Sequence, residues 1–305
     1  MHILLTGGTG LIGRALCEHW QRAGHRLSVW SRTPHKVKTL CGTDVQGIGQ
    51  LAELNGIPLD AVVNLAGAPI ADRPWTDARK TLLLDSRVML THKLINWLAE
   101  QKQRPEVLLS GSAVGWYGNG KELVLSEKMP AATHDFGHEL CQAWETSAQG
   151  AEPLGIRLIT VRTGLVLARN GGFLKRLMPA FKLGLGGRLG NGQQWMSWVH
   201  LADQVALIDF LLMHPTAQGP FNACSPNPVR NEEFTRILGQ TLHRPTLLNV
   251  PAPVLNLLLG ELAGLLLGGQ RAVPDRLLGA GFQFQFTDLK QALTELLSDT
   301  DSTNM

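Results

Sequence analysis

Residues 1–13, MHILLTGGTGLIG, decide the fold of this chain. Residues 2–5 form an apolar run with the length and character of a buried parallel strand. Glycines at positions 7, 10 and 13 follow, and a helical pattern begins at Leu11. A strand, a glycine turn and a helix N-terminus in this order suit a diphosphate, because unpaired helix amides point at the anion and absent side chains let it approach.

The position of this glycine triplet, between a first strand and a first helix, predicts a dinucleotide-binding site. The expected contacts from this segment are Gly7, Thr9, Gly10, Leu11, Ile12 and Gly13.

The second predicted strand, residues 27–30, narrows the choice of cofactor. In NAD-selective sites an acidic residue near the end of this strand binds the adenine ribose hydroxyls. Here Ser31 and Arg32 follow the strand, and the next acid is Asp44. An arginine matches a 2′-phosphate in charge and geometry. We therefore predict NADP(H) rather than NAD(H), with Ser31 and Arg32 as the discriminating pair. The alternative is that Arg32 is only a solvated loop residue.

The composition bounds the class of protein and its partners. The 305 residues are 44% hydrophobic and 17% charged, which is typical of a globular chain with a substantial core. The net charge of +3 comes without a basic run, so no nucleic-acid partner is expected. The four cysteines are scattered, and the first strand leaves no room for a signal peptide. These features favour a reduced, cytoplasmic location.

A leucine-rich segment, residues 253–269, bears on membrane binding. It is too short for a membrane span and carries Asn256 and Glu261. We expect a single buried or interface helix there and no membrane partner.

The first 165 residues alternate strand and helix, which predicts an α/β fold with a doubly wound parallel sheet. After residues 27–30 the expected strands are 61–67, 107–110 and 156–167, and the expected helices are 75–102 and 135–150. Residues 1–165 are therefore predicted to form the nucleotide-binding domain, and residues 198–223 to return to it with a helix at 202–214 and a last strand at 220–223.

The remainder, residues 166–305, is expected to form a substrate-side excursion and a smaller lobe. Residues 170–198 are rich in glycine and are interpreted as a mobile excursion from the sheet. From Asn231, an expected helix N-cap, the pattern is mostly helical, with one short strand at 246–250. Residues 298–305 are expected to form a disordered tail.

Several motifs together resemble the extended short-chain dehydrogenase/reductases: TGGTGLIG at 6–13, NLAG at 64–67, SGS at 110–112 and WVHLADQV at 198–205. The segments at 161–172, 183–200, 242–245 and 281–284 are similar to the subgroup called "epimerase family protein", which carries a small C-terminal domain of unknown function. The resemblance covers nearly the whole chain. It implies a Rossmann-type fold, an NADP(H) site and a mostly helical C-terminal substrate lobe.

The resemblance also implies further cofactor contacts. It places Leu65, Ala66 and Gly67 beside the adenosine and its diphosphate, Arg87 as a polar contact, and Val166 near the nicotinamide amide.

The superfamily's catalytic Tyr-x-x-x-Lys pair is not matched in this chain. The family's spacing puts Phe136 and Leu140 in the two slots, and neither side chain transfers a proton. The only tyrosine, Tyr117, is followed by Lys121, but the glycines between them favour a turn over a helix. Ser112 and Tyr117 are the predicted catalytic groups. His134 and His138 have metal-ligand spacing without a third ligand, so no metal is predicted.

Two hypotheses follow from these residues. The first is an NADP(H)-dependent oxidoreductase or epimerase that acts on an unidentified small carbonyl or hydroxyl substrate with a non-standard acid. The second is a non-catalytic NADP(H)-binding redox sensor or regulatory protein. The pattern leaves monomer and homodimer equally open.

Overall fold

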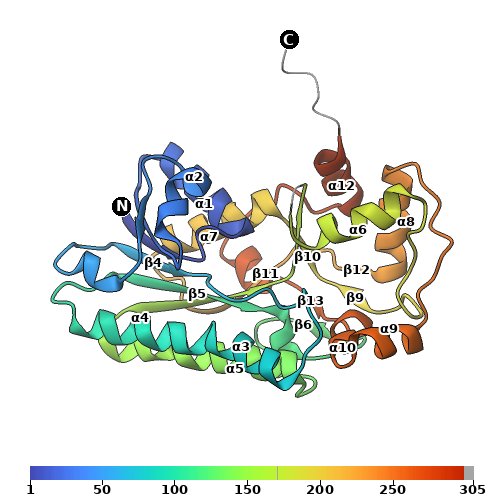
Figure 1. The fold of residues 1–305 in the computed structure, drawn as a ribbon, viewed down its shortest axis with the longest axis horizontal. Coiled ribbons are helices and arrows are strands. Elements are labelled where there is room, and N and C mark those ends of the chain that lie inside the picture. The colour runs from blue at the N-terminus through green and yellow to red at the C-terminus, as the bar shows by residue number, and fades with distance from the viewer. Residues whose placement is uncertain (170, 299–305) are drawn as a thin grey trace, which may run out of the picture. The chain divides into compact units, whose positions relative to one another are not determined.

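A computed structural model describes residues 1–169 and 171–298 of the chain (Figure 1). Its main sheet has seven strands in the order β11-β7-β5-β4-β1-β2-β3. The pairs β1–β2, β2–β3, β1–β4 and β4–β5 are parallel. The order reverses at β1, beside β4, which is the doubly wound arrangement that leaves a crevice at the strand ends. The predicted fold class is confirmed.

The sheet strands are β1 (His2–Thr6), β2 (Arg26–Trp30), β3 (Gln46–Ile48), β4 (Ala61–Asn64), β5 (Val107–Ala113), β7 (Arg157–Thr163) and β11 (Gly219–Ala223). The helices among them are α1 (Leu11–Arg22), α2 (Val37–Cys41), α3 (Asp77–Asp85), α4 (Val88–Glu100), α5 (Phe136–Ala148) and α7 (Leu201–Met213).

The chain divides into two compact units. The first comprises Met1–Trp116, His134–Arg162 and Val205–Phe221, and the second comprises Tyr117–Thr133, Thr163–Gln204 and Asn222–Met305. The sequence had suggested a first domain of residues 1–165, rejoined by residues 198–223. In the structure, residues 117–133, 163–165, 198–204 and 222–223 group with the second unit.

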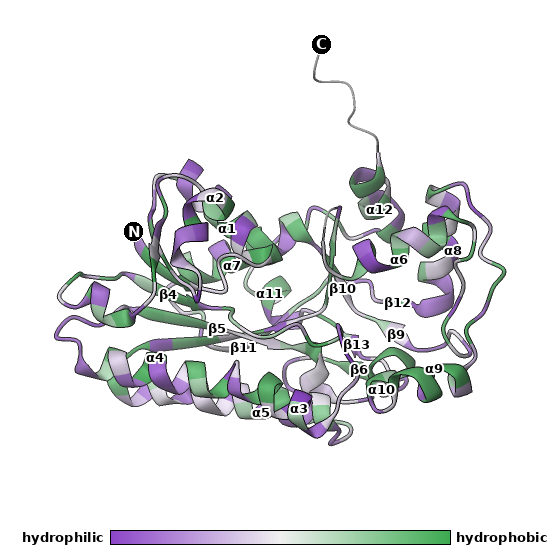
Figure 2. Cartoon of the chain, viewed as in Figure 1, coloured by the Kyte–Doolittle hydropathy of each residue, from purple (hydrophilic) through white to green (hydrophobic). Residues whose placement is uncertain are grey.

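The first unit has helices on both faces of its sheet. Figure 1 shows α1 and α2 on one face and α4 and α5 on the other. Strands covered on both sides need apolar residues along their whole length. Accordingly, all five residues of β1 are buried, and Figure 2 shows β5 in hydrophobic colours.

Two predicted elements of this unit were wrong in their extent. The expected helix at 75–102 is two helices, because the backbone of Ser86 and Arg87 departs from regular helical geometry between α3 and α4. The expected strand at 156–167 is two strands, β7 and β8 (Leu165–Ala168), separated at Gly164. A Cβ at Gly164 would lie 2.5 Å from the Ser197 carbonyl oxygen, so this close approach requires glycine.

The second unit contains three two-stranded sheets: β8 with β10 (Trp198–His200), β9 (Trp195–Met196) with β12 (Val229–Arg230), and β6 (Val124–Leu125) with β13 (Arg271–Ala272). Its helices are α6 (Gly172–Lys182), α8 (Asn231–Thr241), α9 (Ala252–Leu259), α10 (Leu262–Leu267), α11 (Asp275–Gly279) and α12 (Leu289–Leu297). Apolar side chains of α6, α8 and α12 share one core.

The glycine-rich excursion contains the helix α6, and its mobility stays a prediction. Three expectations for this unit were wrong. No strand forms among the described residues 246–250, where Val250 makes only an isolated bridge to Leu189. The N-cap of α8 is Arg230, and Asn231 is its first helical residue, whose side-chain oxygen accepts from the Leu189 amide.

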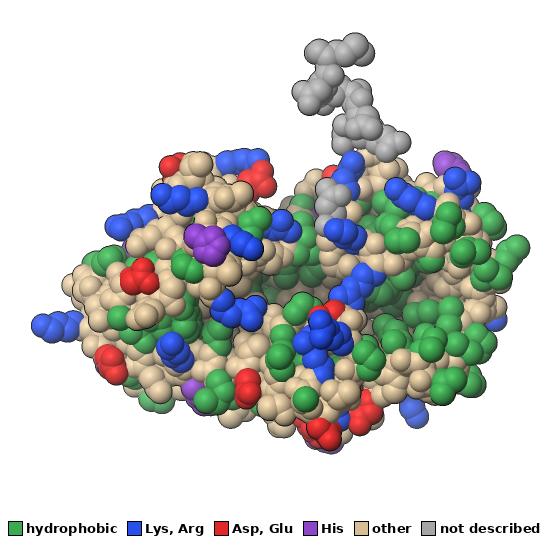
Figure 3. All heavy atoms as spheres, in the orientation of Figure 1, with side chains coloured by type: hydrophobic (Ala, Val, Ile, Leu, Met, Phe, Trp, Pro, Cys, Tyr) green, Lys and Arg blue, Asp and Glu red, His purple; other side chains and the backbone are tan. Residues whose placement is uncertain are grey.

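The third concerns the leucine-rich segment, which is not one helix but is divided between α9 and α10 at Gly260, where φ is +55°. Leu257 and Leu258 are exposed in this chain, and Figure 3 shows hydrophobic side chains gathered where α9 and α10 lie. An interface at this segment stays a prediction. Within the described ranges, no helix has the length and apolar character to cross a membrane. Nearly all of the expected tail, residues 299–305, lies outside the described residues.

Candidate functional site

A cavity of about 830 Å³ lies at the carboxyl ends of β1, β2 and β4 in the first unit. It brings together eight of the predicted cofactor residues: Gly7, Thr9, Gly10, Ser31, Arg32, Leu65, Ala66 and Gly67. The sequence did not single out the other lining residues, which are Trp30, Gly49, Ala68, Ala78, Thr81, Leu82, Asp85, Ser86, Leu90 and Lys93. Most of these come from α3 and α4.

The three glycines of the turn have different structural roles. Gly7 has φ of +72°, and a Cβ there would lie 2.8 Å from the Leu65 carbonyl. A Cβ at Gly13 would lie 2.3 Å from the Gly7 oxygen, so helix and strand pack closely only with glycine there. A Cβ at Gly10 would meet only the Gly7 oxygen, at 3.1 Å, and would otherwise point into the cavity. This division of roles matches the dinucleotide fingerprint.

The N-terminus of α1 is free to bind an anion. Gly10 is its N-cap, and within the described chain no side chain caps this end and its first turn holds no acid. The first amides of a helix have no partner within the helix, and its dipole makes that end positive. Leu11, Ile12 and Gly13 do not line the cavity, and contact of their amides with a cofactor stays a prediction.

The far end of the cavity is basic and aromatic. Trp30 ends β2 and Ser31 follows it, and the Ser31 amide donates to the Ile48 carbonyl at 3.0 Å, which fixes the turn. The Lys93 Nζ lies 5.4 Å from the Trp30 ring centroid. Within the described chain, the side chains of Arg32 and Lys93 donate no hydrogen bond, and the Lys93 ammonium lies over the Trp30 ring. Two cations without a hydrogen-bonded partner among the described residues therefore line one end of the cavity.

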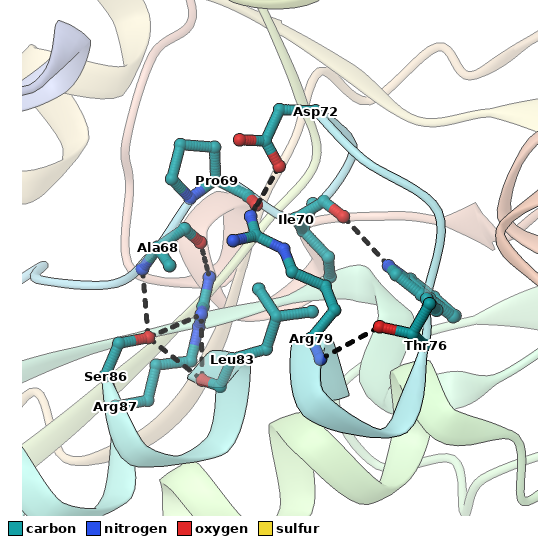
Figure 4. Close-up of polar contacts among 10 residues, drawn as sticks. Ala68, Pro69, Ile70, Asp72, Thr76, Arg79, Leu83, Ser86 and Arg87 are labelled. Carbon is teal, nitrogen blue, oxygen red and sulfur yellow. Dashed lines mark hydrogen bonds and ion pairs between the residues drawn. The ribbon is translucent and has the colours of Figure 1, made fainter. Parts of the chain in front are cut away.

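Arg87 lies behind the cavity wall. Its guanidinium donates to the carbonyls of Ala68 at 3.0 Å and Leu83 at 3.1 Å (Figure 4). It also lies 5.1 Å from the Trp144 ring, and burial lowers its pKa to about 10. A Cβ at Gly67 would lie 2.7 Å from the Arg87 Cζ. The structure thus gives Arg87 a role in shaping the Gly67–Ala68 turn, and its direct contact with a cofactor stays a prediction.

The segment after this turn is fixed to α3. Arg79 bonds to the Pro69 carbonyl and the Asp72 carboxylate, and the Trp75 indole donates to the Ile70 carbonyl at 2.9 Å (Figure 4). Thr76 caps α3 by accepting from the Arg79 amide. These contacts hold the α3 wall of the cavity in place.

Ser112, at the end of β5, belongs to a buried network. Its hydroxyl donates to Glu145 Oε1 at 2.7 Å, and both Glu145 oxygens accept from Arg162, at 2.8 and 2.9 Å. The Arg162 guanidinium lies 3.5 Å from the Trp116 ring centroid. Because the Ser112 proton is directed to Glu145, the Ser112 oxygen is left with lone pairs to accept a further hydrogen bond.

Two positions implied by the resemblance are occupied by apolar side chains. Phe136 begins α5 and packs edge-on against Trp75, with their ring centroids 4.9 Å apart. Leu140, one turn later, is 1% exposed. Neither can exchange a proton with a bound molecule.

Tyr117 and Val166 both lie in the second unit. Tyr117 is fully buried, and its hydroxyl lies 2.8 Å from Asn222 Oδ1 and 3.1 Å from the Ser126 carbonyl. Val166 lies on β8, paired with Val199. The structure gives Tyr117 a packing role, and its catalytic role stays a prediction.

The two histidines do not share a helix, since His134 precedes the first residue of α5. Their rings are in contact, with centroids 4.6 Å apart, and His138 is buried with Nδ1 against the Trp116 carbonyl. In the part of the chain that the structure describes, no three potential ligands gather as a metal site would require.

Comparison with known proteins identifies the family to which this chain is similar. The model of the NAD dependent epimerase/dehydratase family matches residues 3–224, and a domain of unknown function, DUF1731, matches residues 250–296. Epimerase family protein Mb2239 of Mycobacterium bovis is 40% identical over 294 residues, which are 95% of this chain and 96% of that protein. Epimerase family protein YfhF of Bacillus subtilis is 35% identical over 301 residues, which are 98% and 99%.

Among solved structures, human epimerase family protein SDR39U1 (isoform2) with NADPH matches with a TM-score of 0.87 and 31% identity, covering 98% of this chain and 100% of that one. A UDP-galactose 4-epimerase matches with a TM-score of 0.74, 97% coverage of each chain and 17% identity, which shows the fold alone.

Proposed function

Because the chain belongs to the NAD dependent epimerase/dehydratase family, we propose that it is an NADP(H)-dependent enzyme acting on a small carbonyl or hydroxyl substrate. The single observation that carries the choice of cofactor is the basic end of the cavity. Arg32 and Lys93 line it together, and Asp85 is its only acidic lining residue among those described.

The cavity residues fit such a cofactor group by group. The glycine turn and the α1 amides suit the diphosphate, and Trp30 offers a flat surface beside the adenine end. Arg32 and Lys93 have free donors for a 2′-phosphate. The NADPH in the human relative's structure supports this choice for a chain that is 31% identical.

When bound, the cofactor would supply hydride chemistry through its nicotinamide. This chain's contribution to the reaction would then be to hold the substrate oxygen. Ser112 can accept a hydrogen bond from a substrate hydroxyl, because its own hydroxyl proton is donated to Glu145 and its oxygen lone pairs stay available. Tyr117 is the chain's one phenol and is the second candidate for proton transfer.

Titration of NADPH and of NADH with protein, followed by nicotinamide fluorescence, tests the cofactor assignment. We expect NADPH to bind about a hundredfold more tightly than NADH, because two charge-assisted contacts are lost with the 2′-phosphate. In Arg32→Asp this preference should disappear, while Arg22→Asp, at an exposed position outside the cavity, should keep it. Equal affinities in the unmodified protein would overturn the assignment.

A second candidate function is a non-catalytic NADP(H)-binding sensor. The observation that favours it is the pair Phe136 and Leu140, which leaves α5 without an acid at these two positions. Oxidation of bound NADPH by a panel of aldehydes and ketones separates the two functions. Turnover lost in Ser112→Ala supports the enzyme, whereas tight binding without turnover across the panel favours the sensor.

A further inference from the structure

Two cysteines lie together next to the glycine turn of the first unit. Cys17 is on α1, and Cys41 is the last residue of α2. The Gln21 side-chain amide donates to the Cys17 carbonyl at 2.9 Å and to the Cys41 carbonyl at 2.6 Å. One nitrogen thus joins the backbones of both cysteines and holds the last residue of α2 beside α1.

The two thiols are neighbours between α1 and α2, and each perturbs the pKa of the other. The interaction lowers the pKa of Cys41 and raises that of Cys17, because the Cys17 thiol can donate to an ionised Cys41 sulfur. The charge of Arg14 adds to the lowering at Cys41. A thiol of lowered pKa beside a second thiol is the arrangement from which disulfides form.

Cys41 also touches the cofactor loop. Its thiol donates to the Gly8 carbonyl at 3.3 Å, and Gly8 lies inside the turn that begins at Gly7. The other two cysteines, Cys141 and Cys224, are also buried, and burial raises the pKa of both thiols. They provide internal controls in the same molecule.

We propose that Cys17 and Cys41 are a redox modification site, which closes to an intramolecular disulfide when the protein is oxidised by a peroxide. The Cys41 thiol first releases its proton, and the thiolate attacks one peroxide oxygen to give a sulfenic acid. The other oxygen leaves as hydroxide, which combines with the released proton to form water. The Cys17 sulfur then attacks the sulfenic sulfur, and the hydroxyl group leaves with the Cys17 proton as a second water. One peroxide is reduced and two thiols are oxidised.

Access to this buried pair comes through α2. This helix has only five residues and is followed by Gly42 at φ of +116°. A helix so short has little stability of its own, so it opens locally without unfolding the sheet. Opening of α2 exposes Cys41, which is already slightly more exposed than Cys17, before it exposes Cys17 on the longer α1.

The disulfide has a consequence for the turn, which rests on the proposed cofactor function. Forming it removes the thiol proton that Cys41 donates to Gly8. A buried carbonyl without a donor is unfavourable, so the turn shifts toward a conformation in which Gly8 finds another partner. We expect about tenfold weaker NADPH binding in the oxidised protein, the effect of one lost buried hydrogen bond.

The first test is chemical and independent of the cofactor. The full chain is treated with hydrogen peroxide, quenched with iodoacetamide and mapped by mass spectrometry without reduction. We expect a Cys17–Cys41 peptide pair that dithiothreitol reverses, with Cys141 and Cys224 still thiols. In the Cys17→Ser variant, Cys41 should still be oxidised, but the Cys17–Cys41 peptide pair should not form. The proposal is overturned if Cys17 and Cys41 stay reduced in the folded protein, or pair only when circular dichroism shows unfolding.

The second test addresses the coupling to the turn. NADPH affinity is measured before and after peroxide in the unmodified protein, in Cys41→Ser and in the control Cys141→Ser. Serine at position 41 keeps a donor for Gly8, so this variant should bind NADPH and lose its response to peroxide. A disulfide seen by mass with unchanged affinity refutes the coupling and leaves the modification site standing. Absence of NADPH binding in the reduced protein refutes the proposed function, and the peptide map still decides the disulfide.

Discussion

The dinucleotide cavity and the surroundings of Ser112 are built on neighbouring strands of one parallel sheet, but their polar groups are used differently. At the cavity, the side chains of Arg32 and Lys93 have no hydrogen-bonded partner among the described residues, and the start of α1 has no capping side chain. Around Ser112 the hydroxyl, the Glu145 carboxylate and the Arg162 guanidinium are bonded to one another. Groups left without a protein partner are available to a ligand, whereas groups that satisfy each other mainly hold the protein together. The chain is therefore better equipped to bind a cofactor than to move a proton.

The largest expected effect is the loss of stability caused by replacing Glu145. Glu145→Ala leaves Arg162 buried without its carboxylate, and we expect the free energy of unfolding to fall by about 3–5 kcal/mol. Urea denaturation followed by circular dichroism measures this loss. Glu139→Ala, at an exposed position on the same helix, should change it by less than about 0.5 kcal/mol. Equal effects of both variants would show that the Ser112 network does not hold the sheet to α5.

A second prediction concerns the cavity rather than the core. Gly10→Ala adds a methyl group that meets only the Gly7 oxygen within the protein but occupies space in the cavity. We expect NADPH affinity to fall about a hundredfold while the unfolding midpoint stays unchanged, because a diphosphate needs the backbone to be bare there. Gly264→Ala, which has open space on α10, serves as the control. If Gly10→Ala binds NADPH as tightly as the unmodified protein, the diphosphate does not bind at this turn.

A third prediction tests which part of the cofactor Lys93 contacts, by comparing the affinities for NADPH and NADH. Lys93→Gln removes one of the two cations beside Trp30, so NADPH affinity should fall about tenfold and NADH affinity by less than about twofold. Lys102→Gln, on an exposed position just beyond α4, should leave both affinities unchanged. The two dissociation constants come from the same fluorescence titration. A parallel loss for both cofactors would place Lys93 at the adenine or diphosphate instead of the 2′-phosphate.

The sequence predicts the glycine turn and Arg32 better than it predicts the cavity residues on α3 and α4, for a physical reason. The glycine turn and Arg32 lie within a few residues of the strands that position them, so local pattern is enough to find them. Lys93 is about sixty residues from Arg32 along the chain and meets it only through the packing of α4 beside β4. The break at Ser86 has no glycine or proline to mark it. The bonding of Ser112 to Glu145 joins a strand to a later helix, which periodicity cannot reveal.

The smallest expected effect is also the one that decides the role of Tyr117. Its hydroxyl bonds to Asn222, so Tyr117→Phe should lower the free energy of unfolding by about 1 kcal/mol through one lost hydrogen bond. If the phenol is only a packing group, NADPH affinity and any turnover stay as they were. If it is the acid, turnover falls by about 10²–10⁴-fold at unchanged NADPH affinity. The second outcome would require Tyr117 to exchange its Asn222 contact for a substrate oxygen, and this phenol would then supply the proton that Phe136 and Leu140 cannot.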